Sequence, residues 1–340
     1  ALMRGAVMQL DRWGLLDGLL TEGAPAVRKT TFHYGEQVLP LDIRPGHGVE
    51  ILLAPRRTVL DAQLVSAARE AGVDVRHRTA LRKISRDPET GRVTGAVLIN
   101  PQGKTYRVSA DITIGADGRR SSVARQVGAQ SISESQHFTG CVYGYFGGLE
   151  DDGYRWYYAP GVSAGAIPTN SGAHCVFAAV AAAEFRSLKA QHNPHELLSL
   201  IAKRTNQDLA TQLESATPLS HPILFAGAPG HVRQSYGPGW ALVGDAGYFK
   251  DPLTAHGITD ALRDAEILAG SVINGADPAL AAYQETRDRL SRGLFDITDR
   301  IASFDWSLRE LQLLHKQLNE EMKQEQTWMT EAFAPASLAA

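Results

Sequence analysis

The stretch that decides the fold is WALVGDAGYFKDPLTAHGITDALRDAEILA, residues 240–269. It begins as an apolar strand, breaks at an aspartate after glycine, passes through a loop with a proline, and ends in a predicted helix. An earlier segment, DITIGADG at 111–118, also runs an apolar strand into a small residue, an aspartate and a glycine. Because ligands of open α/β sheets collect at the carboxyl ends of the strands, both segments predict one ligand-binding edge.

The residue types at this edge favour a flat, anionic ligand. Asp117 and Asp245 would accept hydrogen bonds from ribityl or ribose hydroxyls, although each aspartate could instead only cap the helix that follows it. A helix start offers unpaired N–H groups and a partial positive charge, which would stabilise the anion of a reduced flavin. Pro252, Ala255 and Gly257 would let a flat ring lie against the backbone. The pattern therefore predicts a flavin site.

Composition excludes several other classes of protein. The chain has 340 residues, 44% of them apolar, and a net charge of −3, which gives no basic face for nucleic acid. Its charge-free stretch at 156–183 is broken by prolines and glycines, so no stable membrane insertion is expected. The histidines have no spacing typical of a metal site, and the two cysteines form no CxxC pair. We therefore expect a cytoplasmic protein with a small-molecule substrate and without a metal ion.

The order of strands and helices predicts three parts. Residues 1–137 with 226–290 form a discontinuous cofactor-binding domain, residues 138–225 an inserted sheet domain, and residues 291–340 a helical C-terminal segment. In the first part, Thr58 is expected to cap a helix, Val73 and Val75 to begin a strand, and residues 81–109 to form a β-meander. The C-terminal segment carries leucines at heptad-like spacing, which would pack on the body or form a homo-oligomer: Leu308, Leu311, Leu314 and Leu318.

Four segments together resemble a known family. They are RGAVMQLDRWGLL (4–16), PRRTVLDAQL (55–64), IGADGRRSSVARQVGA (114–129) and the long segment that ends at residue 269. They are similar to the FAD-dependent aromatic-hydroxylase type of monooxygenase. This resemblance implies an α/β (α+β) fold like that of p-hydroxybenzoate hydroxylase, with a Rossmann-type FAD-binding domain, an inserted, mostly β substrate domain and a helical C-terminus. It also implies FAD as the cofactor and NAD(P)H as a transient electron donor.

The resemblance also assigns cofactor contacts. It implies that Arg4 lies along the ribityl chain, that Arg57 lies near the pyrophosphate and ribityl groups, and that Asp245 binds the ribityl hydroxyls. The remaining implied contacts are Ala80 at the adenine, Asp117 and Gly118 in a motif shared by FAD and nicotinamide, and the isoalloxazine loop with Pro252, Ala255, His256, Gly257 and Ile258. The family's usual Gly-x-Gly after the proline is here Ala255-His256-Gly257, and the unusual His256 either modulates the flavin or points outward.

One expected motif is absent. No GxGxxG occurs in the chain, although the family carries this motif ahead of the RGA segment. We therefore expect that the first β-α-β unit is missing from these 340 residues, and that the chain alone folds poorly and holds little or no FAD.

The resemblance and the aromatic sheet segments lead to a functional hypothesis. We expect an FAD-dependent monooxygenase that hydroxylates or epoxidises an apolar, aromatic small molecule, with no side chain assigned as an obligatory acid or base. The alternatives are an FAD-dependent reductase or dehydrogenase of a lipid-like substrate, and a truncated binding module without catalysis. The YRWYYAPG segment (154–161) does not match the halogenase pattern WxWxIP. The expected walls of the substrate pocket, unless they are plain core, are Tyr143, Tyr145, Trp156 and Tyr158.

Overall fold

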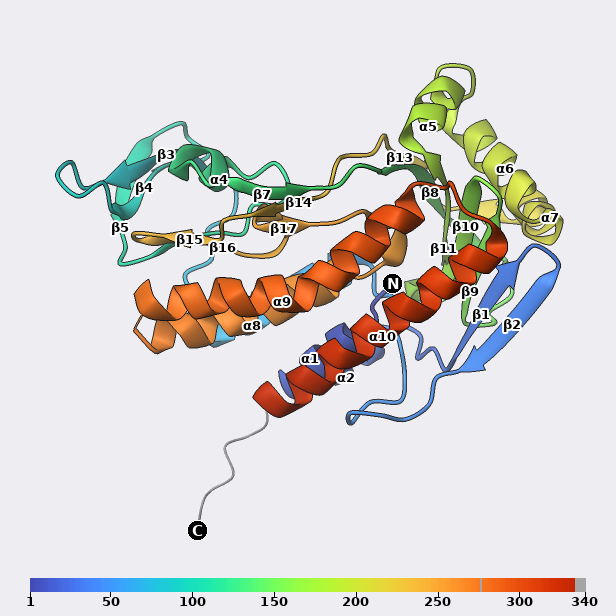
Figure 1. The fold of residues 1–340 in the computed structure, drawn as a ribbon, viewed down its shortest axis with the longest axis horizontal. Helices are drawn as coiled ribbons and strands as arrows, with labels where there is room; N and C mark the ends of the chain where they lie inside the picture. The colour runs from blue at the N-terminus through green and yellow to red at the C-terminus, as the bar shows by residue number, and fades with distance from the viewer. Residues whose placement is uncertain (276, 334–340) are drawn as a thin grey trace, which may run out of the picture.

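The computed structural model describes residues 1–275 and 277–333. Two sheet regions lie at opposite ends of the molecule, and three long helices run between them (Figure 1). One end is a large sheet covered by α5 (Ala182–Lys189), α6 (Pro194–Thr205) and α7 (Gln207–Ser215), and the other end carries the predicted meander β3 (Ala80–Arg86), β4 (Val93–Ile99) and β5 (Thr105–Ser109). The mixed α/β architecture predicted from the sequence is confirmed.

The large sheet has eight strands in the order β12-β8-β11-β10-β9-β1-β2, with β13 also paired to β8. The strands are β1 (Lys29–Tyr34), β2 (Gln37–Asp42), β8 (Thr139–Gly147), β9 (Tyr154–Ala159), β10 (Val162–Pro168), β11 (His174–Ala181), β12 (Thr217–Pro218) and β13 (Ile223–Phe225). Strands β1 and β2 lie before the predicted domain boundary at residue 138 but belong to this sheet, because β1 pairs in parallel with β9 and in antiparallel with β2. This pairing joins segments more than a hundred residues apart, which local sequence patterns do not indicate.

The two faces of this sheet meet different partners. On the back face, Val142, Val176 and Val180 pack against Phe185 of α5 and Leu197 of α6. The front face packs against the core shared by α1 (Arg4–Arg12), α2 (Leu16–Thr21) and α10 (Leu308–Ala332). Because side chains alternate along each strand, the front face of the large sheet is turned toward the predicted cofactor site and the back face is turned away from it.

The two Asp-Gly segments are neighbours, as predicted. Strand β6 (Thr113–Gly115) pairs in parallel with β16 (Trp240–Leu242), and the next backbone N–H, at Val243, donates to Gly115 O at 3.0 Å. Both strands therefore end at the same edge. The rest of this region consists of α3 (Arg57–Glu70), α4 (Ser122–Val127), β15 (Tyr236–Gly237) and a small sheet of β7 (Ser131–Glu134), β14 (His231–Arg233) and β17 (Tyr248–Phe249).

Two local predictions were wrong. Helix α3 begins at Arg57, so Thr58 lies inside its first turn and does not cap the helix, and Arg57 pairs with Asp61 at 2.8 Å. Residues 73–79 form no strand, and Val73 is 55% exposed. Apolar alternation predicts a strand only where a neighbouring strand is present to pair with it, and the described residues supply none here.

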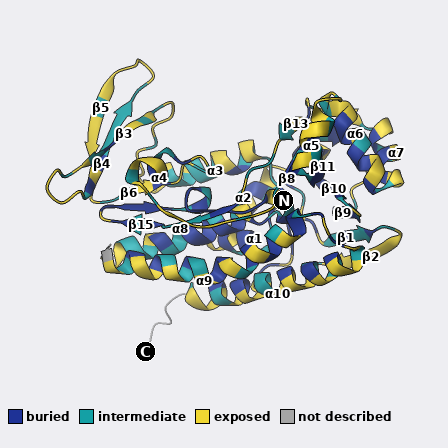
Figure 2. Cartoon of the chain, turned by 45° about the horizontal axis from the view of Figure 1, so that its top comes forward, coloured by how far each residue is buried: buried dark blue, intermediate teal, exposed yellow. Residues whose placement is uncertain are grey.

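The C-terminal helices form one layer of the body. Helices α8 (Gly257–Ile273) and α9 (Asp277–Ala302) lie side by side, and α10 folds back and packs against both α9 and α1 (Figure 1). Leu311, Leu314 and Leu318 of the predicted stripe are buried in the main core, and Figure 2 shows the exposed residues of α10 on its outer side. The stripe therefore packs on the body of the same chain. Among the described helices, none is long and apolar enough to cross a membrane.

Candidate functional site

The predicted flavin loop is a short turn that leads directly into α8. The 3-10 turn η3 (Pro252–Thr254) is followed by Ala255 in the left-handed conformation with φ 51°, and α8 begins at Gly257. Pro252 and Gly257 are exposed, and a Cβ built on Gly257 would meet nothing within 4 Å. His256 precedes the helix without capping it through its side chain. The loop is therefore an open backbone surface at a helix start, as a flat anionic ring requires.

Asp251 connects the loop to the large sheet through hydrogen bonds. Asp251 accepts hydrogen bonds from Thr139 N at 2.7 Å and from Thr139 Oγ1 at 2.9 Å, and it also accepts from Leu253 N at 3.0 Å. Burial raises the pKa of Asp251, while the hydrogen bonds from Thr139 and Leu253 oppose that rise. Since Thr139 is the first residue of β8, the loop sits at the start of the strand that carries Tyr143 and Tyr145.

Asp245 lies where a cofactor hydroxyl could reach it. Its half-buried carboxylate has no hydrogen bond to another described residue, whereas its backbone carbonyl accepts from His231 at 3.0 Å. Burial and the nearby Asp260 raise the pKa of Asp245, and Arg119 and Arg57 act in the opposite direction. A carboxylate that faces cations without bonding to the protein fits the predicted ribityl contact.

Unlike the carboxylate of Asp245, the carboxylate of Asp117 forms hydrogen bonds within the protein. Its carboxylate accepts hydrogen bonds from Ser121 Oγ at 2.5 Å and from Ser122 N at 2.6 Å. The alternative role, capping the start of α4, is therefore the one that the structure shows. Gly118 follows with φ 76° and open space where a Cβ would lie, so the turn leaves room for a ligand.

The other predicted contacts are dispersed. Arg4 donates to Gly46 O at 2.9 Å and to Val49 O at 2.7 Å, and so holds the loop that contains them. Arg57 is exposed beside Asp61, within electrostatic range of Asp245. Ala80 is exposed at the start of β3, in the separate meander sheet. Arg57 thus lies within electrostatic range of Asp245 without a contact between them, and the cofactor roles of Arg4, Arg57 and Ala80 stay predictions.

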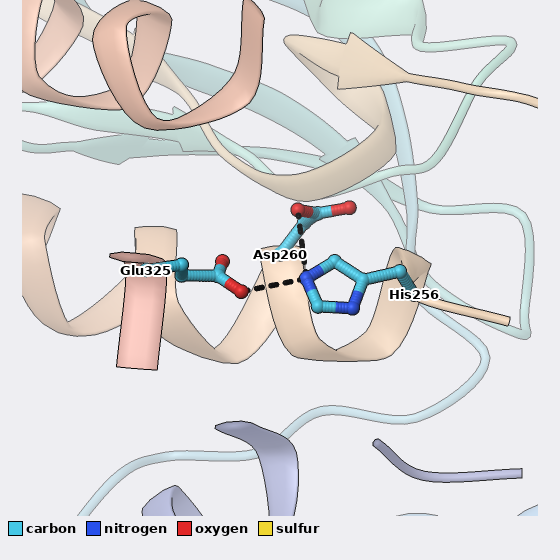
Figure 3. Close-up of side chains that lie close together, drawn as sticks. All are labelled: His256, Asp260 and Glu325. Atoms are coloured by element: carbon cyan, nitrogen blue, oxygen red, sulfur yellow. Dashed lines mark hydrogen bonds and ion pairs between the residues drawn. The ribbon is translucent and has the colours of Figure 1, made fainter. Parts of the chain in front are cut away.

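A buried ionic network lies directly behind the flavin loop. His256 Nε2 lies 2.7 Å from Glu325 Oε2 of α10 and 3.9 Å from Asp260 Oδ1 (Figure 3). Arg263 donates to Glu325 Oε1 at 2.5 Å, and Lys250 pairs with Asp260. Burial alone would raise the pKa of Glu325, but His256 and Arg263 lower it to about 2. His256 therefore points into the body and not outward from the loop.

The same cluster was missed by sequence reasoning. His256, Asp260 and Glu325 offer ligand atoms within 4.8 Å of one another, which is a geometry that could hold a cation. Lys250 and Arg263 already supply two positive charges to these carboxylates, so a metal ion has no charge to balance there. A signal was present in the sequence, since Asp260, Arg263 and Asp264 follow His256 at helical spacing.

The four predicted wall residues share the front face but divide into two pairs. Tyr143 and Tyr145 are half-buried, and the Arg56 guanidinium lies 3.6 Å from the centre of the Tyr145 ring. Trp156 and Tyr158 are each only 6% exposed, and the Tyr158 ring packs 4.8 Å from His315 of α10. Trp156 and Tyr158 are therefore core residues, which was the alternative prediction for these aromatic side chains. Tyr143 and Tyr145 remain accessible to a ligand.

Comparison with known proteins agrees with this geometry. The family model described as FAD binding domain matches residues 2–298. The chain belongs to the FAD binding domain family. Its sequence is 29% identical over 233 residues to digeranylgeranylglycerophospholipid reductase 1 of Methanococcoides burtonii, covering 66% of this chain and 53% of that protein. The corresponding reductase of Methanosarcina acetivorans is 29% identical, with 71% of this chain and 59% of that protein covered. The chain thus spans between half and three fifths of the length of these curated relatives.

Solved structures share the fold. The flavin-dependent brominase Bmp2 superposes with a TM-score of 0.76 at 17% identity, covering 96% of this chain and 81% of that one. PqsL of Pseudomonas aeruginosa, described as a probable FAD-dependent monooxygenase, gives a TM-score of 0.74 at 19% identity. The superposition covers 94% of this chain and 88% of PqsL. The p-hydroxybenzoate-hydroxylase-like fold expected from the sequence is therefore confirmed.

Proposed function

We propose that the protein is an FAD-dependent monooxygenase that uses NAD(P)H and O2 to hydroxylate or epoxidise an apolar, aromatic small molecule. One observation carries the proposal: the hydrogen bonds between Asp251 and Thr139 fix the flavin loop at the start of the strand that bears Tyr143 and Tyr145. A ring on the loop would therefore face an aromatic wall. Apolar aromatic walls suit apolar substrates and exclude water from the reaction.

The residues present fit a flavin. When bound, FAD supplies the redox chemistry, and the protein orients the reactants. The open backbone from Pro252 to Gly257 would support the ring, and the start of α8 would stabilise negative charge at the edge of that ring. Asp245 would accept hydrogen bonds from the ribityl hydroxyls, and Arg57 would lie near the adjoining phosphates.

The wall itself stays uncharged at neutral pH. Burial raises the pKa of Tyr143 and of Tyr145, and it raises the pKa of Cys141 and Cys175 on the same face. These phenols and thiols therefore remain protonated, and they can position a neutral substrate or donate a hydrogen bond to it.

A second candidate is an FAD-dependent reductase of a lipid-like substrate. The observation that favours it is the sequence similarity to proteins named digeranylgeranylglycerophospholipid reductases. The protonated groups of the wall would also serve this reaction, since saturating a double bond needs a proton in addition to a hydride. The brominase likeness, at 17% identity, supports the fold alone.

Oxygen consumption separates the two candidates. NAD(P)H oxidation by the purified natural full-length protein would be followed together with O2 uptake, with and without apolar aromatic compounds. Uptake that rises on addition of substrate, with incorporation of one oxygen atom into the product, supports the monooxygenase. Substrate reduction under strictly anaerobic conditions supports the reductase and contradicts the leading proposal.

A further inference from the structure

A second pocket, of about 270 Å³, lies on the back of the large sheet. Its floor is made by residues of β1 and β9, and α7 contributes one wall. Thr31 is paired in register with Arg155, and His33 with Tyr157. These side chains alternate with Phe32 and Trp156, which face the flavin side, so the sheet itself separates this pocket from the flavin loop.

The floor holds a buried cation without a counter-ion. Arg155 is 5% exposed, and it donates to Gln212 Oε1 at 2.8 Å and to Glu150 O at 3.2 Å. Both acceptors are neutral, and among the described residues no carboxylate forms an ion pair with Arg155. Its Nε has no hydrogen-bond acceptor in the described part of the chain. A buried charge without a partner is costly, so a carboxylate from outside the chain would complete this site.

The neighbours of Arg155 complete a small recognition surface. Thr31 is 4% exposed, and its Oγ1 has no hydrogen-bond partner among the described residues. The rings of His33 and Tyr157 stack with their centres 4.3 Å apart and form a flat side to the pocket. Burial and then Arg155 lower the pKa of His33, so this ring is neutral at physiological pH. A hydroxyl and a guanidinium side by side are a donor set for one carboxylate.

The rim of the pocket has the opposite charge. The charge of Asp152 is neutralised by Lys29, whose Nζ lies 2.8 Å from Asp152 Oδ1. Glu150 and Asp208 also line the pocket, are exposed, and form no ion pair within the described residues. A simple anion would be attracted by the floor but repelled by this rim. A ligand with a carboxylate at one end and an ammonium at the other satisfies both.

We propose that this pocket binds a small zwitterion of the amino-acid type, with its carboxylate on Arg155 and Thr31 and its ammonium toward Glu150 and Asp208. The volume agrees with this class, because a water molecule occupies about 30 Å³ in the liquid and a short amino acid replaces only a handful of waters. The inference does not depend on the flavin, since the site lies on the other face of the sheet.

Three matched compounds test the ligand class. Binding of L-alanine, propionate and ethylamine to the purified protein would be measured by calorimetry and by thermal unfolding at equal ionic strength. Propionate lacks the ammonium of L-alanine, and ethylamine lacks its carboxylate. We expect millimolar L-alanine to bind and to raise Tm, and both fragments to bind at least about tenfold more weakly, the loss of roughly one good polar contact. Propionate or inorganic phosphate binding as well as L-alanine, or no binding of L-alanine, would overturn the proposal.

Two variants test the assigned contacts. In Thr31→Val the unpartnered hydroxyl is removed at nearly constant shape, so Tm without ligand should stay equal or rise while L-alanine affinity falls about tenfold. Arg155→Met should abolish binding, and Arg204→Met, which only breaks an exposed pair with Glu184 on α5, should bind as the wild type does. If Arg155→Met does not fold, Thr31→Val decides the question. A lower Tm with unchanged L-alanine affinity in Thr31→Val would show that the hydroxyl is structural and would contradict the site.

Discussion

His256 Nε2 lies 2.7 Å from Glu325 Oε2, so the residue before the start of α8 is bonded to the C-terminal helix. Both side chains are essentially inaccessible to solvent, and Arg263 shares the same carboxylate. Helix α10 therefore supports α8 from behind, at the end where the proposed flavin ring would rest. The position of the flavin loop depends on a residue far along the chain.

Removing Glu325 should destabilise the protein strongly. In Glu325→Ala, His256 loses a buried hydrogen-bond partner and Arg263 loses a buried counter-charge, and we expect a loss of about 3–5 kcal/mol in the free energy of unfolding. Urea denaturation measures this loss, and amide hydrogen exchange in residues 253–257 should become faster. Glu320→Gln, an exposed change on the same helix, should stay within about 0.5 kcal/mol of the wild type. Equal effects of the two substitutions would contradict a specific role for Glu325.

Asp245→Ala should weaken FAD binding by about 1–3 kcal/mol, because hydroxyls of the cofactor would lose their acceptor. Arg57→Ala should weaken FAD binding as well, since Arg57 is within electrostatic range of Asp245. Arg56→Ala is the matched control, because its guanidinium lies on the Tyr145 ring. Flavin fluorescence titration compares the three, and equal losses for Arg56 and Arg57 would show that the proposed register of this motif is wrong.

The two aromatic pairs should respond differently to substitution. Tyr143→Ala and Tyr145→Ala should raise KM for an apolar substrate, whereas Tyr143→Phe, which keeps the ring, should act nearly as the wild type does. Trp156→Ala should instead cost about 3–5 kcal/mol of stability, because this ring is buried in the core. Steady-state kinetics and thermal unfolding separate these effects. A KM that is unchanged in both alanine variants of the first pair would remove them from the pocket.

His315 should make the protein less stable in mild acid. Burial lowers its pKa to about 4 while its Nδ1 lies 2.8 Å from the Tyr34 hydroxyl, so the folded protein holds the ring neutral. The unfolded chain binds a proton near its ordinary pKa of about 6.5, and therefore stability is full above that pH and falls as the pH drops toward 4. Between about pH 7.5 and about pH 5 this group should account for roughly 2 kcal/mol.

Two histidine variants check this pH dependence by urea denaturation. His315→Gln should reduce the loss of stability between neutral and mildly acidic pH. Some pH dependence of stability should remain, because burial and Arg233 lower the pKa of His231 to about 4 as well. His195→Gln, at an exposed position, should leave the profile unchanged. A profile that His315→Gln does not alter would contradict the assignment.

The sequence predicted the features that depend on short, local patterns of residues. The strand, aspartate and glycine pattern placed Asp117 and Asp245 at the ends of adjacent parallel strands, and the helix predicted after the proline loop begins at Gly257. These features depend on backbone periodicity and on small residues, both of which can be read over a short window.

What the sequence did not predict comes from long-range packing. The pairing of β1 with β9 and the contact of Glu325 with His256 join residues that are remote along the chain. Trp156 and Tyr145 have similar aromatic patterns, but only Trp156 is covered by the body, and a pattern of alternation cannot distinguish the two. Val73 looked like a strand residue and is exposed, since a strand needs a neighbour that local sequence does not specify.

The most direct test of the central claim is a flavin titration of the natural full-length protein, with hydrogen exchange measured before and after FAD is added. We predict a yellow protein in which FAD slows amide exchange from Leu253 through Ile258, and Asp245→Ala reduces both the affinity and this protection. Protein that fails to bind FAD, or FAD binding that leaves the exchange of these amides unchanged, would contradict the assignment of this loop and helix start as the flavin site.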